Sequence, residues 1–128
     1  EHLSQIYFQF ENPVDMRQLE MADGALTFEM RMLKRPTEPV TLRMDCGWPC
    51  SGEIDITTIL AKSPAAEWQR LAFPMKCFAQ LGVDSSKVNT PFLLATTGEL
   101  SFELSHVVLA ESAGEASVMS CSELLADL

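Results

Sequence analysis

The side chains that catalysis uses most often are sparse in this 128-residue sequence, apart from carboxylates. There are two histidines: His2 is near one end, and His106 lies within an apolar run, where a lone histidine is more often structural than catalytic. The signatures of a serine-hydrolase elbow, a phosphate-binding loop and a zinc-protease helix do not occur. A Cys–His dyad would need His106 beside a cysteine in space, and no local signature supports one. We therefore predict no catalytic residue in this chain.

The eighteen acidic residues raise the alternative of a glycosidase. Such an enzyme needs two carboxylates, about 5–5.5 Å apart if it retains configuration and about 6.5–9.5 Å apart if it inverts. Glu53 and Asp55 are two apart and would share one face of a strand, and Glu29, Asp45 and Glu103 could lie nearby. Pairs of this kind are common on acidic, solvent-facing strands, so catalysis by these groups remains the minor hypothesis.

The four cysteines are Cys46, Cys50, Cys77 and Cys121. A zinc site would need a second close pair or two nearby histidines, and neither is present, so we predict no metal ligands. A disulfide between Cys46 and Cys50 would close a loop that contains Gly and Pro, and buried free thiols are the other possibility. A structural calcium ion stays possible without named ligands, because a site made by distant loops leaves no signature. We expect no other cofactor.

Three aromatic side chains are candidates for contact with a sugar, whose apolar ring faces stack on aromatic rings. Trp48 lies between two cysteines and beside Pro49, which makes its exposure credible. Trp68 opens a strand, a position more typical of a core residue. Tyr7 does not share a face with Phe8, so it would point outward.

The elements that must position these residues follow from alternation of apolar and polar side chains, the pattern of half-buried strands. Leu26, Phe28, Met30 and Met32 would face one way, and Val40, Leu42 and Met44 repeat the pattern. In the last strand the alternation changes parity, which predicts a β-bulge near Ser105 and His106. Strands are expected over 5–10, 25–33, 40–44, 53–56, 68–73, 92–96 and 100–109, and short helical turns from Thr57, over 75–81 and from Ser122.

Seven or eight short strands without a long amphipathic helix predict an all-β fold, a jelly-roll β-sandwich with one or two short helical turns. We expect a single domain over 1–128, with its core over about 5–110 and a tail over 111–128. Hydrophobic residues make up 47% of the chain, which is sufficient for one core.

Net charge is −9, which disfavours several classes of partner. The densest basic group, Arg31, Lys34 and Arg35, is too sparse to displace counterions from nucleic acid or to bind an anionic membrane. No apolar stretch approaches the roughly 18 residues of a membrane span, and no signal peptide is visible. The abrupt opening at Glu1 suggests an excised domain. A neutral glycan or a basic protein surface remains open as a partner.

Several segments together resemble the C-terminal galactose-binding-like domain of some bacterial family 3 glycoside hydrolases, close to exo-1,3/1,4-β-glucanases. The resemblance extends over about 19–109 and depends on the order and spacing of its pieces. These pieces are 24–28, 46–57, 68–78, 82–84, 87–92, 96–102 and 106–109.

The resemblance implies a non-catalytic accessory domain of a periplasmic or secreted exo-β-glucanase or β-glucosidase that degrades β-glucan. The partners it implies are the catalytic domains of the same chain, a barrel and an α/β domain. Family members retain configuration, using an aspartate nucleophile and a glutamate acid/base, and both would lie on those other domains. His106 departs from the acidic residue that related sandwiches often carry there, which puts a calcium site in doubt.

Two functions remain open at this stage. The first is a carbohydrate-binding module that binds β-glucan or an oligosaccharide through Trp48, Tyr7 or Trp68. The second is a structural module that packs on the catalytic domains or forms an oligomer interface. In that case the loop carrying Asp45, Trp48 and Glu53 would lie near the mouth of the active site.

Overall fold

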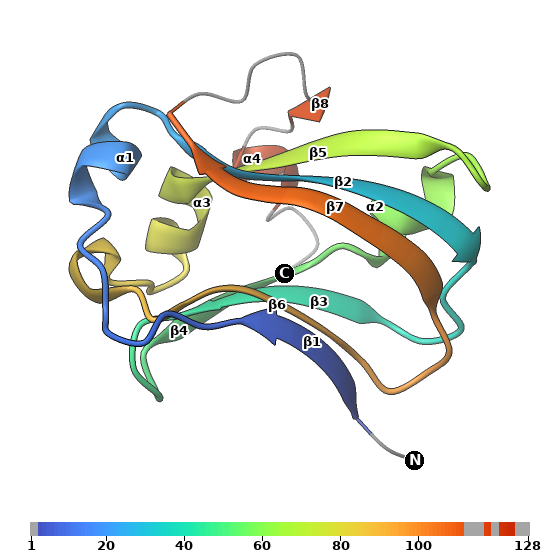
Figure 1. Ribbon diagram of the computed structural model, residues 1–128, viewed down its shortest axis with the longest axis horizontal. Helices are drawn as coiled ribbons and strands as arrows, with labels where there is room; N and C mark the ends of the chain where they lie inside the picture. Colours follow the sequence, from blue (N-terminus) through green and yellow to red (C-terminus); the bar gives the residue numbers. More distant parts are fainter. Residues whose placement is uncertain (1–2, 112–116, 119–120, 125–128) are drawn as a thin grey trace.

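The chain folds into two four-stranded β-sheets that pack face to face in the computed structural model, which describes residues 3–111, 117–118 and 121–124 (Figure 1). One sheet has the strand order β1-β6-β3-β4 and the other the order β7-β2-β5-β8. All neighbouring strands are antiparallel except β5 and β8. The strands are β1 (Ser4–Phe8), β2 (Ala25–Lys34), β3 (Val40–Asp45), β4 (Ser51–Asp55), β5 (Trp68–Pro74), β6 (Thr90–Thr96), β7 (Ser101–Ala110) and β8 (Ser117–Val118). The predicted all-β sandwich is confirmed.

The core lies between the sheets, where the alternating apolar residues of β2 and β3 meet. Their inward side chains are almost completely buried, as the period of two predicts. Phe28 is central: its ring stacks on Phe73 with centroids 5.7 Å apart and meets the edge of Phe92 at 5.3 Å. Burying one such ring stabilises the fold by roughly 1.5–3 kcal/mol. The two sheets therefore share one hydrophobic core.

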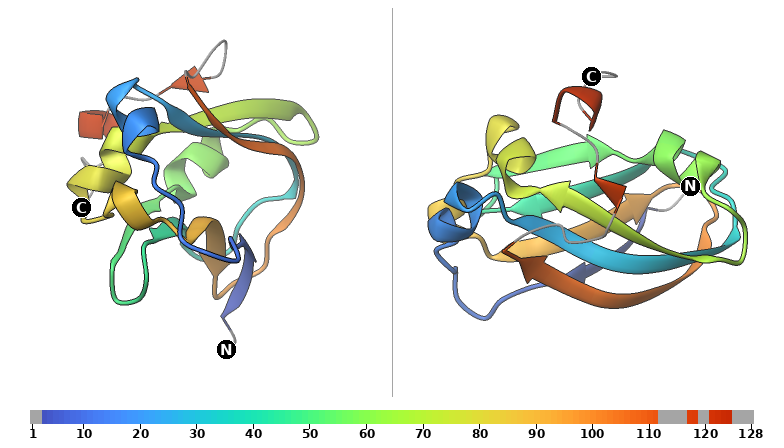
Figure 2. Two further views of the ribbon diagram at one scale, coloured as in Figure 1. Left: turned by 60° about the vertical axis from the view of Figure 1, so that its left-hand side comes forward. Right: turned by 90° about the horizontal axis from the view of Figure 1, so that it is seen from above.

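Short helices cover the ends of the sandwich. They are α1 (Arg17–Met21), α2 (Thr57–Lys62), α3 (Met75–Gln80), the 3-10 turn η1 (Ser85–Lys87) and α4 (Cys121–Leu124). The turns expected from Thr57 and over 75–81 are present, whereas α1 was not predicted. Figures 1 and 2 place α1, α3 and η1 together at one end of the sandwich. No helix among the described residues is long and apolar enough to cross a membrane.

The predicted bulge in β7 is confirmed. Thr27 pairs with Val108 and Glu29 with Ser105, so Phe28 lies opposite two residues, His106 and Val107. His106 has a φ of +52°, a left-handed conformation that is uncommon for a residue with a Cβ. The extra residue lets Leu104 and Val107 both pack against the core despite their opposite parity.

One long side of the sandwich is open between the edge strands β1 and β7. Ile6 and Phe8 have the parity of inward residues, yet they are 41% and 46% exposed. Two hollows of about 610 Å³ and 540 Å³ run along this β1–β7 seam. The apolar residues that line them are Ile6, Phe8, Phe10, Leu26, Pro91, Leu94, Ala95, Leu100, Phe102, Leu104, Val107, Val108 and Leu109. Apolar and polar side chains therefore do alternate in β1, but the inward side chains of this strand are not buried.

Two disulfides join the four cysteines. One joins Cys46 to Cys50 across four positions of the sequence. The other joins Cys77 in α3 to Cys121 in α4, 44 positions apart, and it was not predicted. Most of the expected tail, 111–128, lies outside the described residues.

Candidate functional site

The sheet β1-β6-β3-β4 has an outward-facing surface that carries Tyr7, Asp45, Trp48 and Glu53, the predicted glycan-contact and loop residues apart from Trp68. Tyr7 of β1 lies opposite Leu93 of β6, Leu93 lies opposite Arg43 of β3, and Arg43 lies opposite Glu53 of β4. Directly opposite residues point to the same side of a sheet. These four side chains therefore form one row across all four strands, although they come from distant parts of the sequence.

A hollow of about 260 Å³ lies on this surface, and we call it the outer-sheet hollow. It brings together three of the predicted residues, Tyr7, Asp45 and Trp48. Glu53 is the next residue along the row. The lining of the hollow also contains residues that were not predicted from the sequence: Gln5, Gln9, Arg43, Asn89, Thr90 and Leu93. Gln5 and Gln9 have the parity of Tyr7, so the period of two in β1 carried that signal.

Trp48 stands on a short, closely tied loop between β3 and β4. The Cys46–Cys50 disulfide closes the loop, and the Cys46 N–H donates to the Cys50 carbonyl at 2.8 Å. Gly47 has a φ of +90°, which a residue with a Cβ rarely adopts. Trp48 is 73% exposed, so this loop holds a large aromatic ring in solvent.

Arg43 lies beneath Trp48 and is paired with Asp45. Its guanidinium carbon is 5.3 Å from the centroid of the Trp48 ring, within the range of a cation–π interaction. Its Nε lies 2.9 Å from Oδ1 of Asp45, at an angle that makes an ion contact but no hydrogen bond. Nη2 donates to Oδ2 at 3.4 Å. The two side chains are only 26% and 13% exposed, so this pair is far better shielded from water than a surface ion pair.

Asn89 connects this loop to β6. Its side-chain Oδ1 accepts a hydrogen bond from the Gly47 N–H at 3.2 Å, and its own N–H donates to the Asp45 carbonyl at 3.1 Å. Its carbonyl accepts from the Phe10 N–H at 2.7 Å, which ties in the chain just after β1. One residue thus holds the Trp48 loop and two strands around the hollow in fixed relation.

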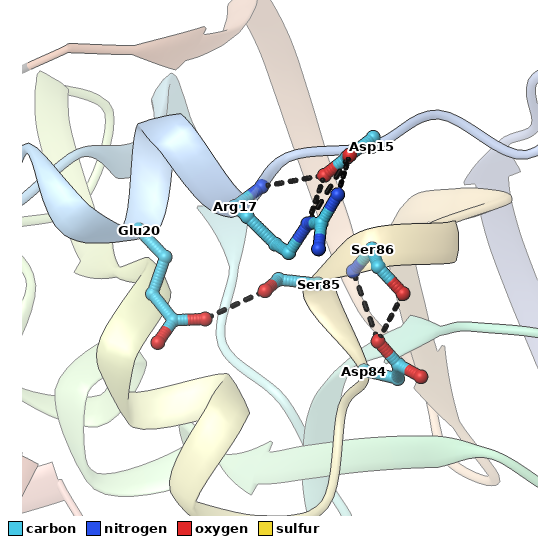
Figure 3. Close-up of polar contacts among 6 residues, drawn as sticks. All are labelled: Asp15, Arg17, Glu20, Asp84, Ser85 and Ser86. Atoms are coloured by element: carbon cyan, nitrogen blue, oxygen red, sulfur yellow. Dashed lines mark hydrogen bonds and ion pairs between the residues drawn. The ribbon is translucent and has the colours of Figure 1, made fainter.

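Polar contacts at the α1–η1 end position Asn89 in turn (Figure 3). Ser85 donates to Oε1 of Glu20 at 2.7 Å, which ties η1 to α1. Asp84 accepts from the N–H of Ser86 at 3.0 Å and from its hydroxyl at 2.6 Å, as an N-cap does. Since η1 ends two residues before Asn89, these contacts fix the start of β6.

Two carboxyl groups at this end have lowered pKa values. Hydrogen bonds from the Arg17 side chain and backbone lower the pKa of Asp15 from 3.8 to about 2. The hydroxyl and N–H of Ser86 lower the pKa of Asp84. Both carboxyl groups therefore favour the charged form, in which they accept these hydrogen bonds.

Trp68 lies on the other sheet, far from the outer-sheet hollow. It is opposite Arg31 of β2, which is opposite Glu103 of β7, on the outward face of that sheet. The Arg31 guanidinium is 5.3 Å from the Trp68 ring and forms an ion pair with Glu103. Trp68 is 48% exposed, so the expectation of a core position is wrong. Its strand parity places it with charged residues, not with the core.

His106 and Asp55, two of the residues with catalytic potential, make local contacts that do not form a catalytic arrangement. Nδ1 of His106 lies 2.8 Å from Oε2 of Glu29 and 2.6 Å from the Ser105 hydroxyl, so acid and hydroxyl meet the same ring nitrogen. A serine–histidine–acid relay needs them on opposite nitrogens. Asp55 accepts from both the N–H and the hydroxyl of Thr57, at the start of α2. Within the described residues, no group of three or more His, Cys, Asp or Glu side chains is placed to hold a metal ion.

The outer-sheet hollow can bind a ligand through ring stacking and hydrogen bonds. Two exposed aromatic rings border it, and each can stack on an apolar ring face. The amides of Gln5, Gln9 and Asn89 can each donate and accept hydrogen bonds. Its volume is slightly below the roughly 300–1,000 Å³ typical of pockets for drug-sized ligands, which suits one or two small rings of a longer chain.

Comparison with known families places most of this chain in a described family. The family model Exop_C, described as galactose-binding domain-like, matches residues 1–109, which is most of the chain. No significant match to a curated protein sequence was found.

Three solved structures are similar in fold. The exo-1,3/1,4-β-glucanase ExoP from a Pseudoalteromonas species has a TM-score of 0.69 at 18% identity over 92% of this chain, which spans 14% of that enzyme. The extra C-terminal domain of ExoP scores 0.70 at 18% identity, covering 93% of this chain and 64% of that one. A family 30 carbohydrate-binding module scores 0.66 at 16% identity, covering 95% and 67%. At these identities the likeness shows the fold alone.

Proposed function

This chain belongs to the Exop_C family of galactose-binding-like domains, and we propose that it is a non-catalytic, carbohydrate-binding accessory domain. Its parent would be an exo-β-glucanase or β-glucosidase of glycoside hydrolase family 3, acting in β-glucan breakdown. The chain would deliver or hold glycan for catalytic domains elsewhere in that polypeptide. The similar fold of a domain of ExoP and of a family 30 carbohydrate-binding module supports the proposal.

One observation carries this function: Tyr7 and Trp48 border the same hollow. Sugars have apolar ring faces and a rim of hydroxyl groups. Two exposed rings beside Gln5, Gln9 and Asn89 offer both kinds of contact in one place. The hollow lies on the open face of a sheet, so a long glycan chain could cross it without needing a free end.

The proposed location is the periplasm or the outside of the cell. Disulfides persist in oxidising compartments, and all four cysteines of this chain are paired. The Cys46–Cys50 disulfide matters most here, because it closes the loop that presents Trp48. For the structural calcium ion that the sequence left possible, we propose no ligands.

Calorimetric titration of the chain with mixed-linkage β-glucan and laminari-oligosaccharides tests the proposal. We expect saturable heat with a dissociation constant of about 1 mM or tighter, which corresponds to about −4 kcal/mol. Trp48→Ala should weaken binding at least about tenfold, and Tyr7→Ala about threefold or more, through lost stacking. Trp68→Ala is the matched control: it removes the same side chain from the opposite sheet and should leave affinity unchanged. No heat with any of these glycans would exclude the proposed function.

The open β1–β7 seam favours a second candidate, a structural module that packs on the catalytic domains. Ile6 and Phe8 would then be covered by another domain of the same polypeptide. In that arrangement the loop with Asp45, Trp48 and Glu53 could lie at the mouth of the active site. Ile6→Gln should lower the melting temperature of the full-length parent more than that of the isolated chain, where Ile6 is already exposed. Equal effects in both would count against this role.

A further inference from the structure

We propose that Asp45 is the specificity-determining residue of the outer-sheet hollow and restricts it to neutral glycans. It does so by occupying Arg43, which would otherwise bind the carboxylate of a uronic acid. The inference rests on the proposed function and adds the charge class of the ligand. It depends on three features of the hollow: its single cation, the shielding of that cation and the charges around it.

Arg43 is the one cationic side chain among the described residues that line the hollow. A guanidinium recognises a carboxylate best when its planar fork of N–H donors is free to pair with both oxygens. In this hollow an isolated Arg43 would therefore make acidic sugars the preferred ligands.

Asp45 and Trp48 block that use of Arg43 from two directions. Asp45 approaches the Nε and Nη2 side of the guanidinium, with Nε 2.9 Å from Oδ1 and Nη2 3.4 Å from Oδ2. Trp48 covers one face of the same group at 5.3 Å. The Asp45 side chain is held in place by the strand register, because its backbone pairs with Ser51 and Thr90 on both sides. With only 13% of the carboxylate side chain exposed, a competing sugar carboxylate cannot displace it easily.

The charges next to Arg43 also oppose an anionic ligand. Glu53 lies directly opposite Arg43 on β4, and Asp55 lies opposite Thr41, both exposed on the same side of the sheet. These two carboxylates add negative charge on the β4 side of the hollow, in a chain whose net charge is −9. A uronic acid would meet this repulsion and find the Nε and Nη2 side of Arg43 already taken by Asp45, whereas a neutral sugar meets no such repulsion.

The test compares two glycans that differ only at C6, where one is neutral and the other anionic. One probe is mixed-linkage β-glucan oligosaccharide, and the other is the same oligosaccharide after oxidation of its C6 primary alcohols to carboxylates. For the wild-type chain we expect the neutral probe to bind at least about tenfold more tightly than the carboxylated one at low salt. Asp45→Asn removes the carboxylate but keeps the shape, so it should raise affinity for the carboxylated probe about tenfold. High salt should weaken that gain.

Glu53→Gln is the matched control, because it changes net charge by the same amount and leaves the Arg43–Asp45 pair intact. It should raise affinity for the carboxylated probe about threefold or less. The double variant Arg43→Gln with Asp45→Asn should lose the gain. Near-ultraviolet circular dichroism checks that each variant is folded, and the wild-type comparison stands even if one is not.

Equal wild-type affinity for both probes, or equal gains in Asp45→Asn and Glu53→Gln, would overturn the role of Asp45 while leaving glycan binding intact. If the wild-type chain bound neither the neutral nor the carboxylated probe, the proposed function itself would be overturned, and this inference with it.

Discussion

Each outer face of the sandwich carries a tryptophan, an arginine and a carboxylate in contact. Comparing the two faces shows which features favour a binding site over an ordinary surface contact. On one face Trp48 covers Arg43, which pairs with Asp45. On the other, Trp68 covers Arg31, which pairs with Glu103. Both rings lie 5.3 Å from their guanidinium groups. An exposed tryptophan beside an arginine is therefore not sufficient evidence for a binding site.

The two faces differ in backbone support and in shape. Trp48 stands on a loop closed by a disulfide and borders a hollow that also contains Tyr7. Trp68 lies along strand β5, with charged residues opposite it. The Arg43–Asp45 pair is also better shielded, with side chains 26% and 13% exposed against 34% and 43% for Arg31 and Glu103. A ring fixed by a disulfide-closed loop beside a second aromatic residue, together with a better shielded ion pair, is what favours the first face, since the residue types are alike on both.

The largest effect is expected from the two disulfides, which separate stability from binding. Replacing Cys77 and Cys121 by serine releases a long loop and should cost about 4 kcal/mol in the chain-entropy model, against about 2 kcal/mol for Cys46 and Cys50. Chemical denaturation measures both. Affinity for β-glucan should change in the opposite order, falling about fivefold or more without Cys46–Cys50, since Trp48 is then no longer held in place.

The Cys77–Cys121 variant is the control for binding, and it should bind normally at temperatures where it is folded. If the Cys46–Cys50 variant also bound normally, the loop would not be what distinguishes the two faces.

The second prediction compares the two arginines directly. Arg43→Ala leaves the shielded Asp45 carboxylate without its partner and should lower the free energy of unfolding by about 1–3 kcal/mol. Arg31→Ala leaves Glu103, which is 43% exposed and readily hydrated, so the loss should be at most about 1 kcal/mol. Urea denaturation of both variants measures the difference. Equal losses would mean that shielding does not distinguish the pairs.

The sequence predicted the strands better than it predicted which residues meet on each outer face of the sandwich. The period of two identified the buried residues of β2 and β3, and the parity change identified the bulge at His106. Both signals are local, because successive side chains in a strand alternate sides. The short helix α1 was missed, since five residues carry too little periodicity to identify a helix.

The site was only partly predictable, because it depends on strand order. Trp48 and Tyr7 were identified as aromatic candidates, and the hollow brings them together. Arg43 was missed because its place in one hollow with Tyr7 requires β3 to lie beside β6 and β6 beside β1, an order that does not follow the sequence. Trp68 was wrongly favoured as a core residue, although it alternates with the buried Leu71 and Phe73 and shares the parity of Arg70. The Cys77–Cys121 pairing joins distant helices, which spacing alone cannot identify.

The third prediction concerns Asn89, which ties the Trp48 loop to β6 on the first face. Asn89→Ala removes the acceptor of the Gly47 N–H and should cost about 1 kcal/mol of stability. We expect β-glucan affinity to fall about threefold, because the Trp48 loop gains freedom. Hydrogen exchange of the Gly47 amide, followed by NMR, reports the loss directly. An unchanged exchange rate would show that the disulfide alone holds the loop.

The smallest effect is expected from acid, and it tests whether the α1–η1 end supports the first face only. The pKa of Asp15 is lowered from 3.8 to about 2, and that of Asp84 is also lowered. A carboxyl group whose pKa is depressed by folding stabilises the native state above its unfolded pKa, and this contribution is lost as the pH falls through the folded value. Wild type should therefore lose its advantage in melting temperature over the double variant Asp15→Asn with Asp84→Asn between about pH 4 and pH 2. Since both groups are exposed, we expect a shift of only a few degrees. In a variant that lacks Trp48, the remaining tryptophan fluorescence comes from Trp68 on the other face. If the same acidification changed this fluorescence, the effect of acid would extend beyond the α1–η1 end, and the two faces would be coupled.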